Sequence, residues 1–96
     1  MPRSNNDQPP CAYVVGGEWP RAVLADDAPV SAFYGQEVAK KLARAMEEHE
    51  FGLRRLGEEA GVAHTTIGRI IRGQVLPDIG TLARLEMTLE TVLWPI

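Results

Sequence analysis

The chain has 96 residues, one cysteine and a formal net charge of −3, which limits it to one domain with a modest core and excludes an internal disulfide and a helical catalytic domain with a deep cleft. No apolar run approaches the length of a membrane span, so we expect a soluble, cytoplasmic protein. Cys11 fits a reducing compartment, although an incidental small apolar residue explains it equally well.

Two segments precede the predicted helical domain. Residues 1–10 hold mainly Pro, Asn, Asp, Gln and Ser and are predicted to be disordered. In the N-terminal extension, residues 11–28, the runs 12–15 and 21–24 have strand character on either side of a Gly-Gly turn, which predicts a β-ribbon. Such a ribbon is marginal alone. We therefore expect it to lie on the helices, with Trp19 as its anchor, or to pair with a second copy across a two-fold axis, and we favour the second arrangement.

Residues 29–96 carry the apolar periodicity of an all-α domain. A stripe at helical spacing predicts a helix over residues 30–49. The members of this stripe are Tyr34, Val38, Leu42, Ala45 and Met46. Another helix is predicted over residues 79–89, with Asp78 as its N-cap. Residues 92–94 then return apolar side chains to the core.

Between these two helices, the shorter segments 53–60 and 64–72 have the spacing of a helix-turn-helix. Gly61 can take the positive φ that ends the first segment. Gly57 lies one turn earlier, where only a small side chain lets the two helices approach closely. The outer face of the second segment is polar, basic or small, as a base-reading surface should be. It consists of His64, Thr65, Gly68, Arg69 and Arg72.

From about residue 38 to residue 94, the chain resembles the lambda-repressor/Cro-like (XRE) family of helix-turn-helix regulators. Beyond the motif itself, residues 73–82 read GQVLPDIGTL. This is similar to the glycine, short loop and Pro-Ser/Asp-x-x-Thr-Leu with which the family opens its fourth helix, and Leu93-Trp94-Pro95 is similar to the ending of small members. The resemblance implies a lambda-repressor-like domain of four to five helices that binds double-stranded DNA, regulates transcription and forms a homodimer.

The resemblance also implies which residues contact DNA. The matching positions of the family touch base edges, so the candidate base contacts are His64, Thr65 and, one turn later, Arg69. The candidate phosphate contacts are Gly52, Leu53, Arg54, Arg55, Arg72 and Gln74. At most one of the two adjacent arginines can point directly at the DNA backbone. For each of these residues, an ordinary polar helix start or a solvated surface side chain is the alternative.

The chain departs from the family at four positions. Leu53 stands where many members have a glutamine that touches DNA. Ala63 replaces the usual Ser or Thr cap, a loss of about 1 kcal/mol. Met46 and Ile71 replace an Arg–Glu ion pair with two apolar side chains, and such a swap need not reduce stability.

Charge distribution leaves a second hypothesis open. Residues 52–76 hold four arginines and two glutamates, a charge of +2, so the remainder of the chain carries −5. A positive end is compatible with DNA binding, but it predicts fewer phosphate contacts than a basic domain makes. The alternative is a protein-interaction module, antitoxin-like or a co-regulator, on the same fold. No constellation of residues suggests catalysis, a metal or a cofactor, so we expect no enzyme.

Overall fold

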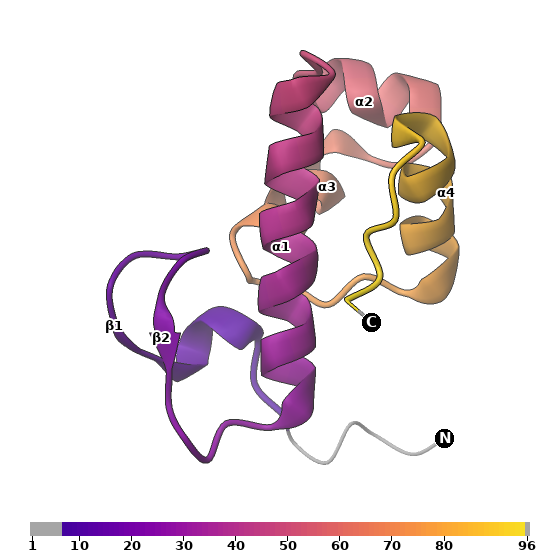
Figure 1. The fold of residues 1–96 in the computed structure, drawn as a ribbon. Helices are drawn as coiled ribbons and strands as arrows, with labels where there is room; N and C mark the ends of the chain where they lie inside the picture. Colours follow the sequence, from indigo (N-terminus) through magenta and orange to yellow (C-terminus); the bar gives the residue numbers. More distant parts are fainter. Residues whose placement is uncertain (1–6, 96) are drawn as a thin grey trace.

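The computed structural model describes residues 7–95, and this part of the chain contains four α-helices, a 3-10 helix and a two-stranded ribbon (Figure 1). The helices are α1 (Val30–Glu48), α2 (Leu53–Ala60), α3 (His64–Ile71) and α4 (Ile79–Leu89). Each predicted helix is present with bounds within one residue of the prediction, and the all-α fold class is confirmed. No fifth α-helix forms in the described residues. None of the helices between residues 7 and 95 has the length and apolarity that a bilayer crossing requires.

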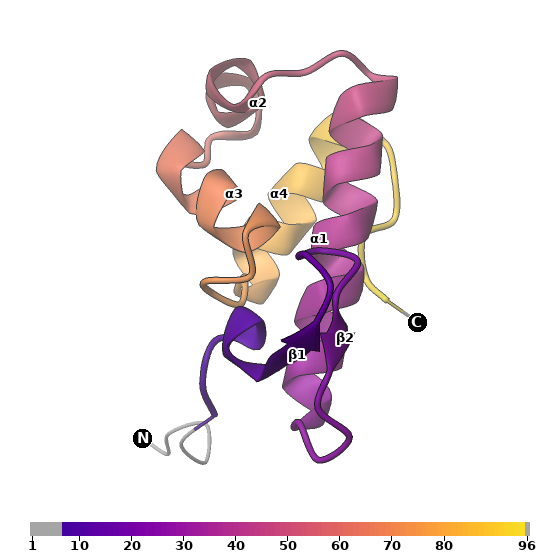
Figure 2. The same cartoon turned by 90° about the vertical axis from the view of Figure 1, so that its left-hand side faces the viewer.

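The core lies where α2, α3 and α4 gather on one side of α1 (Figures 1 and 2). Its buried side chains recur every three or four positions along each helix, as the apolar stripes predict. They are Val38, Leu42, Ala45, Met46, Leu56, Ala60, Ile67, Ile70, Leu82, Leu85, Leu89 and Leu93. Each fully buried Leu or Ile contributes roughly 1.5–3 kcal/mol through the hydrophobic effect. The motif helices are short, so this packing holds them in place.

The N-terminus of α4 is capped as the sequence predicts. The carboxylate of Asp78 accepts a hydrogen bond from the backbone N–H of Thr81 at 2.7 Å. The backbone N–H and the side chain of Thr81 hold the pKa of Asp78 below its usual value. This cap fixes the point at which the chain leaves the loop after α3 and enters α4.

The chain that follows α4 ties this helix to α1. The carboxylate of Glu86 accepts hydrogen bonds from the backbone N–H groups of Leu93 (2.8 Å) and Trp94 (2.9 Å). Lys41 donates to the Trp94 carbonyl at 3.0 Å. The Trp94 ring meets Tyr34 edge to face, with centroids 5.7 Å apart. Of the three residues 92–94 that the sequence predicts to return to the core, only Leu93 is fully buried; Val92 and Trp94 remain exposed.

The N-terminal extension forms the predicted ribbon and folds back on its own chain. A 3-10 helix, η1 (Pro10–Tyr13), leads into β1 (Val14–Gly16), which pairs antiparallel with β2 (Val23–Leu24). The ribbon lies beside the N-terminal half of α1 (Figure 1), and Leu24 and Ala22 are buried. This is the fold-back arrangement, the one of the two that the sequence did not favour. Because the helices of the same chain cover these side chains, the ribbon needs no second copy to bury them.

The sequence predicts disorder over residues 1–10. Positions 1–6 of this segment lie outside the described residues. The described end of that segment is packed against the domain. Pro10 is buried against the bare backbone of Gly35, where an added Cβ would lie 2.6 Å from the proline ring. The carboxylate of Asp7 accepts a hydrogen bond from the Ser31 hydroxyl at 2.9 Å. The boundary of the folded unit therefore lies before residue 11.

Candidate nucleic-acid interface

A tight turn sets the angle at which α3 leaves α2. Gly61 ends α2 with φ +73°, and its N–H donates to the Gly57 carbonyl at 2.9 Å. Val62 donates to the same carbonyl at 3.0 Å. A Cβ on Gly57 would lie 2.6 Å from the Val62 carbonyl oxygen and 3.2 Å from the His64 nitrogen. The two glycines therefore have the roles that the sequence predicted, a left-handed helix end and a close approach.

The outer face of α3 brings the three candidate base contacts together. Thr65 and Arg69 are exposed one turn apart, and His64 is half-buried at the first position of the helix. On the opposite side of α3, Ile67 and Ile70 point inward and are buried. Arg72 follows on the same side, and its guanidinium lies over the backbone of Gly68. A Cβ on Gly68 would lie 3.0 Å from a guanidinium nitrogen of Arg72. Arg69 and Arg72 form no ion pair within residues 7–95.

The N-terminus of α2 offers free backbone donors beside this face. Gly52 is its N-cap, and neither Gly52 nor Ala63, the N-cap of α3, supplies a side-chain hydrogen bond. The first-turn N–H groups of both helices are therefore uncapped, which favours an anion such as a phosphate. Leu53 is half-buried against the core, so only its backbone is presented outward.

The two adjacent arginines of α2 differ in their surroundings. Arg55 donates to the Glu59 carboxylate at 3.0 Å, and its guanidinium lies 4.7 Å from the centre of the Phe51 ring. Arg54 instead lines a hollow at the junction of α2 and α3 together with His64, and it has no ion pair within the described residues. Arg54 is thus the arginine on the side of the candidate base contacts.

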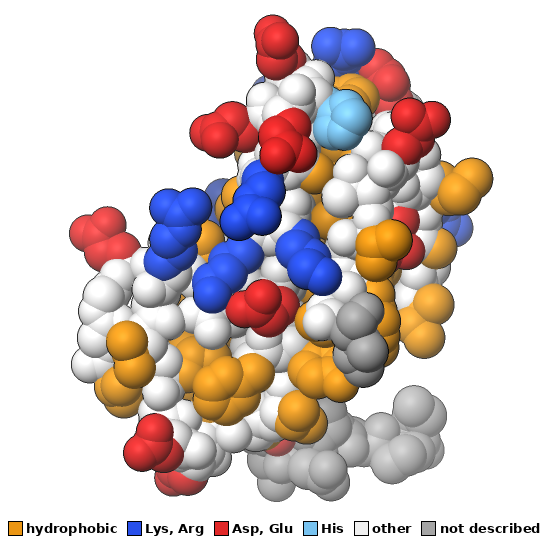
Figure 3. All heavy atoms as spheres, in the orientation of Figure 1, with side chains coloured by type: hydrophobic (Ala, Val, Ile, Leu, Met, Phe, Trp, Pro, Cys, Tyr) orange, Lys and Arg blue, Asp and Glu red, His pale blue; other side chains and the backbone are white. Residues whose placement is uncertain are grey.

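A second group of cations lies on another face of the molecule. Figure 3 shows Lys and Arg side chains gathered over the middle of α1, and Figure 2 shows that α3 lies on the opposite side of the domain. Arg21 of the ribbon lines one hollow there with Lys40, Arg44 and Glu47. The sequence reasoning missed this group because carboxylates adjacent in the sequence cancel its charge. The positive charge is therefore not confined to the face of α3.

Residues 42–92, more than half of the chain, match the helix-turn-helix family. The chain belongs to this family, whose XRE or lambda-repressor-like members are DNA-binding, non-enzymatic domains of transcription regulators. This confirms the resemblance drawn from the motif. The match covers α2, α3, α4 and the end of α1, and it leaves the ribbon outside. A search among curated proteins gave no match. A search among solved structures gave none either.

Proposed function

We propose that this protein is a sequence-specific transcriptional regulator that reads the major groove of DNA with α3. The observation that carries the proposal is the exposed face of α3 beside the uncapped N-terminus of α2: Thr65 and Arg69 are exposed there, and Arg69 has no ion pair within residues 7–95. His64 and Thr65 contact base edges near the start of the helix. Arg69 donates two hydrogen bonds to the O6 and N7 atoms of a guanine.

Phosphate groups flank this reading face on both sides. The first-turn N–H groups at Gly52 and Leu53 bind one phosphate together with Arg54. Arg72, at the other end of α3, binds a second phosphate, and the exposed amide side chain of Gln74 lies just beyond it. Arg55 contributes less, because its guanidinium is already engaged by Glu59 and Phe51.

We further propose that two copies bind a two-fold site, since one helix reads too few base pairs for useful specificity. The buried side chains of the ribbon, Ala22 and Leu24, are covered by its own chain, so we propose that the second copy docks on another surface. Exposed apolar side chains run along α4 and the segment after it: Ile79 and Met87 are each 79 % exposed and Val92 is 66 % exposed. Patches of this kind mark interaction surfaces. Sedimentation should show that Met87→Glu weakens self-association, whereas an unchanged dimer would place the interface on another face.

Selection of bound duplexes from a random pool tests the function. The wild type should enrich one motif. Arg69→Ala should cost about 1–3 kcal/mol at one base position and relax the preference there. Arg72→Ala is the matched control, because loss of a phosphate contact weakens all sequences alike and lowers the salt slope by about one unit. An unchanged motif with Arg69→Ala would refute the base-reading role.

The same selection distinguishes the second candidate, a protein-interaction module on this fold. The exposed apolar side chains of α4 favour it, as does the acidic net charge of −3. A protein of that kind would enrich no motif from the pool. Any residual affinity of such a protein for duplex DNA would fall by the same amount with Arg69→Ala as with the loss of any other exposed arginine.

A further inference from the structure

The N-terminal ribbon packs against the C-terminal end of α3 and donates a hydrogen bond to it. The indole N–H of Trp19 donates to the backbone carbonyl of Ile71 at 2.7 Å, across 52 residues of sequence. Ile71 is the last residue of α3. Carbonyl groups in the last turn of a helix have no donor within that helix. Backbone N–H groups of residues 72–74 satisfy those of Gly68, Arg69 and Ile70, and Trp19 supplies the donor for Ile71.

The same segment also covers the turn by which the chain leaves α3. Gly73 ends the helix with φ +72°, and a Cβ on it would lie 2.5 Å from the Trp19 ring. The Gly73 carbonyl in turn accepts a hydrogen bond from the backbone N–H of Cys11 at 2.9 Å. Two separate points of the N-terminal extension therefore hold the end of α3.

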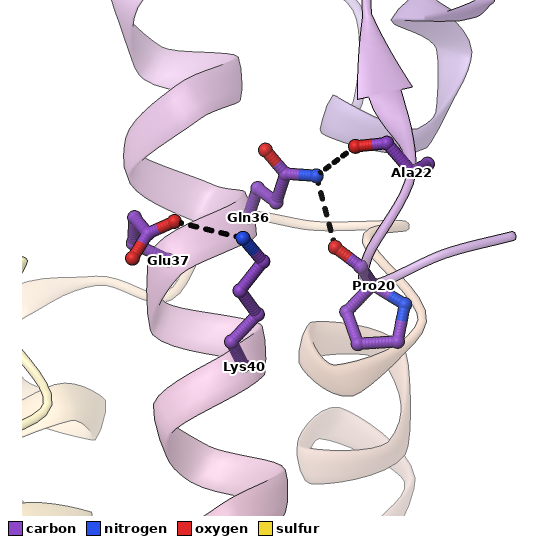
Figure 4. A network of polar contacts seen from close by, with 5 residues as sticks. All are labelled: Pro20, Ala22, Gln36, Glu37 and Lys40. Carbon is purple, nitrogen blue, oxygen red and sulfur yellow. Dashed lines mark hydrogen bonds and ion pairs between the residues drawn. The ribbon is translucent and has the colours of Figure 1, made fainter. Parts of the chain in front are cut away.

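The ribbon is itself fixed to α1 immediately beside Trp19. The side-chain amide of Gln36 is buried and donates to the carbonyls of Pro20 (2.9 Å) and Ala22 (2.6 Å) (Figure 4). Buried polar groups of this kind are costly to leave without partners, so the contact specifies one position for the ribbon. The end of α3 is thus connected to α1 through the ribbon, in addition to the shared core.

We propose that Trp19 is a positioning residue for DNA reading: it fixes the last turn of α3 and thereby Arg69, the base-contacting arginine that this turn carries. This inference rests on the proposed function. Trp19 lies outside residues 42–92, the part of the chain that matches the family. It touches no DNA in this account, and its effect passes through the backbone of Ile71 and Gly73.

Trp19→Phe tests the proposal because it keeps an aromatic ring over Gly73 and removes the indole N–H. Trp94→Phe is the matched control, since Trp94 is the other tryptophan of the chain and packs against Tyr34. Urea unfolding of both variants establishes that they are folded. Two further measurements follow: amide hydrogen exchange in the last turn of α3 without DNA, and affinity for the duplex selected by the wild type and for a mixed-sequence duplex.

Trp19→Phe should speed the exchange of the amides of residues 72–74 relative to those of α2 and α4. It should weaken binding of the selected duplex by about three- to tenfold, the range expected for one lost hydrogen bond. Binding of the mixed-sequence duplex should change by less than about twofold, because phosphate contacts tolerate a loosened helix end. A residue that only stabilised the fold would weaken both duplexes alike. That outcome, or equal effects from Trp94→Phe, would overturn the proposal.

If the wild type enriches no motif, the proposed function fails, while the exchange measurement still decides whether Trp19 braces α3.

Discussion

Gly57→Ala is the sharpest test of the close contact between α2 and the turn before α3. Gly57 is buried in the middle of the motif, and a Cβ there would lie 2.6 Å from the carbonyl oxygen of Val62. The group it meets is backbone, so it cannot rotate away. The helix or the turn must move, and the reading face of α3 moves with the turn.

Two opposing effects decide the magnitude. Replacing glycine by alanine inside a helix favours folding by up to about 1 kcal/mol. Overpacking a tight contact costs about 1–3 kcal/mol, and a separation of 2.6 Å from a backbone atom places Gly57→Ala at the upper end. We therefore expect a net fall of about 1–2 kcal/mol in the free energy of unfolding. For a domain of this size, each 1 kcal/mol lowers the melting temperature by about 4–8 °C.

Urea unfolding followed by circular dichroism measures this change. Gly80→Ala in α4 is the matched control, because its Cβ would meet no backbone: the nearest atoms are the flexible end of Arg84 at 3.3 Å and the Asp78 carboxylate at 3.5 Å, an ordinary van der Waals distance. The control should be neutral or more stable than the wild type by up to about 1 kcal/mol. If Gly57→Ala proved as stable as Gly80→Ala, the argument from close approach would be wrong.

Three further predictions follow from the contacts described. Arg54→Ala should lower the slope of log affinity against log salt by about one unit, and Arg55→Ala should lower it by less; equal slopes would refute the assignment of Arg54 to phosphate. Ile71 is half-buried against the core cluster that contains Met46, so Ile71→Glu should destabilise the domain by about 1–3 kcal/mol in urea unfolding, and adding Met46→Arg should recover part of this loss; a double variant no more stable than the single one would contradict the pairing of these two positions. The folded-state pKa of Asp78 lies below its unfolded value, so its carboxylate stabilises the fold above about pH 4 and this contribution is lost as the pH falls through the folded pKa. Unfolding of Asp78→Asn should accordingly depend less on pH in the acid range, and parallel pH profiles would count against the cap.

The helices could be predicted because their signals are local. The stripe in α1, the glycine at position 61 and the cap at Asp78 each depend on residues within one or two turns. Gly57 was predictable for the same reason, since it lies one turn before the helix end. These local preferences agree with the tertiary packing, and the observed bounds therefore follow the pattern closely.

The remaining features depend on contacts between distant segments. The hydrogen bond from Trp19 to Ile71 joins positions 52 residues apart, and no periodicity indicates it. The ribbon is hydrogen-bonded to α1 through Gln36, a polar residue that a search for a stripe of apolar positions overlooks. The i, i+4 spacing to a glutamate applies to both adjacent arginines, so the sequence does not tell which of them is paired. The structure places the ion pair at Arg55 and Glu59.

We propose that DNA lies against α3 and the start of α2. Amide chemical-shift mapping of the labelled protein with the duplex selected by the wild type tests this directly, because a second group of cations, Arg21, Lys40 and Arg44, lines a separate hollow beside α1. The account predicts the largest shifts at residues 52–55 and 64–74, with small shifts along the outer face of α1. Large shifts confined to Arg21, Lys40 and Arg44 would contradict it.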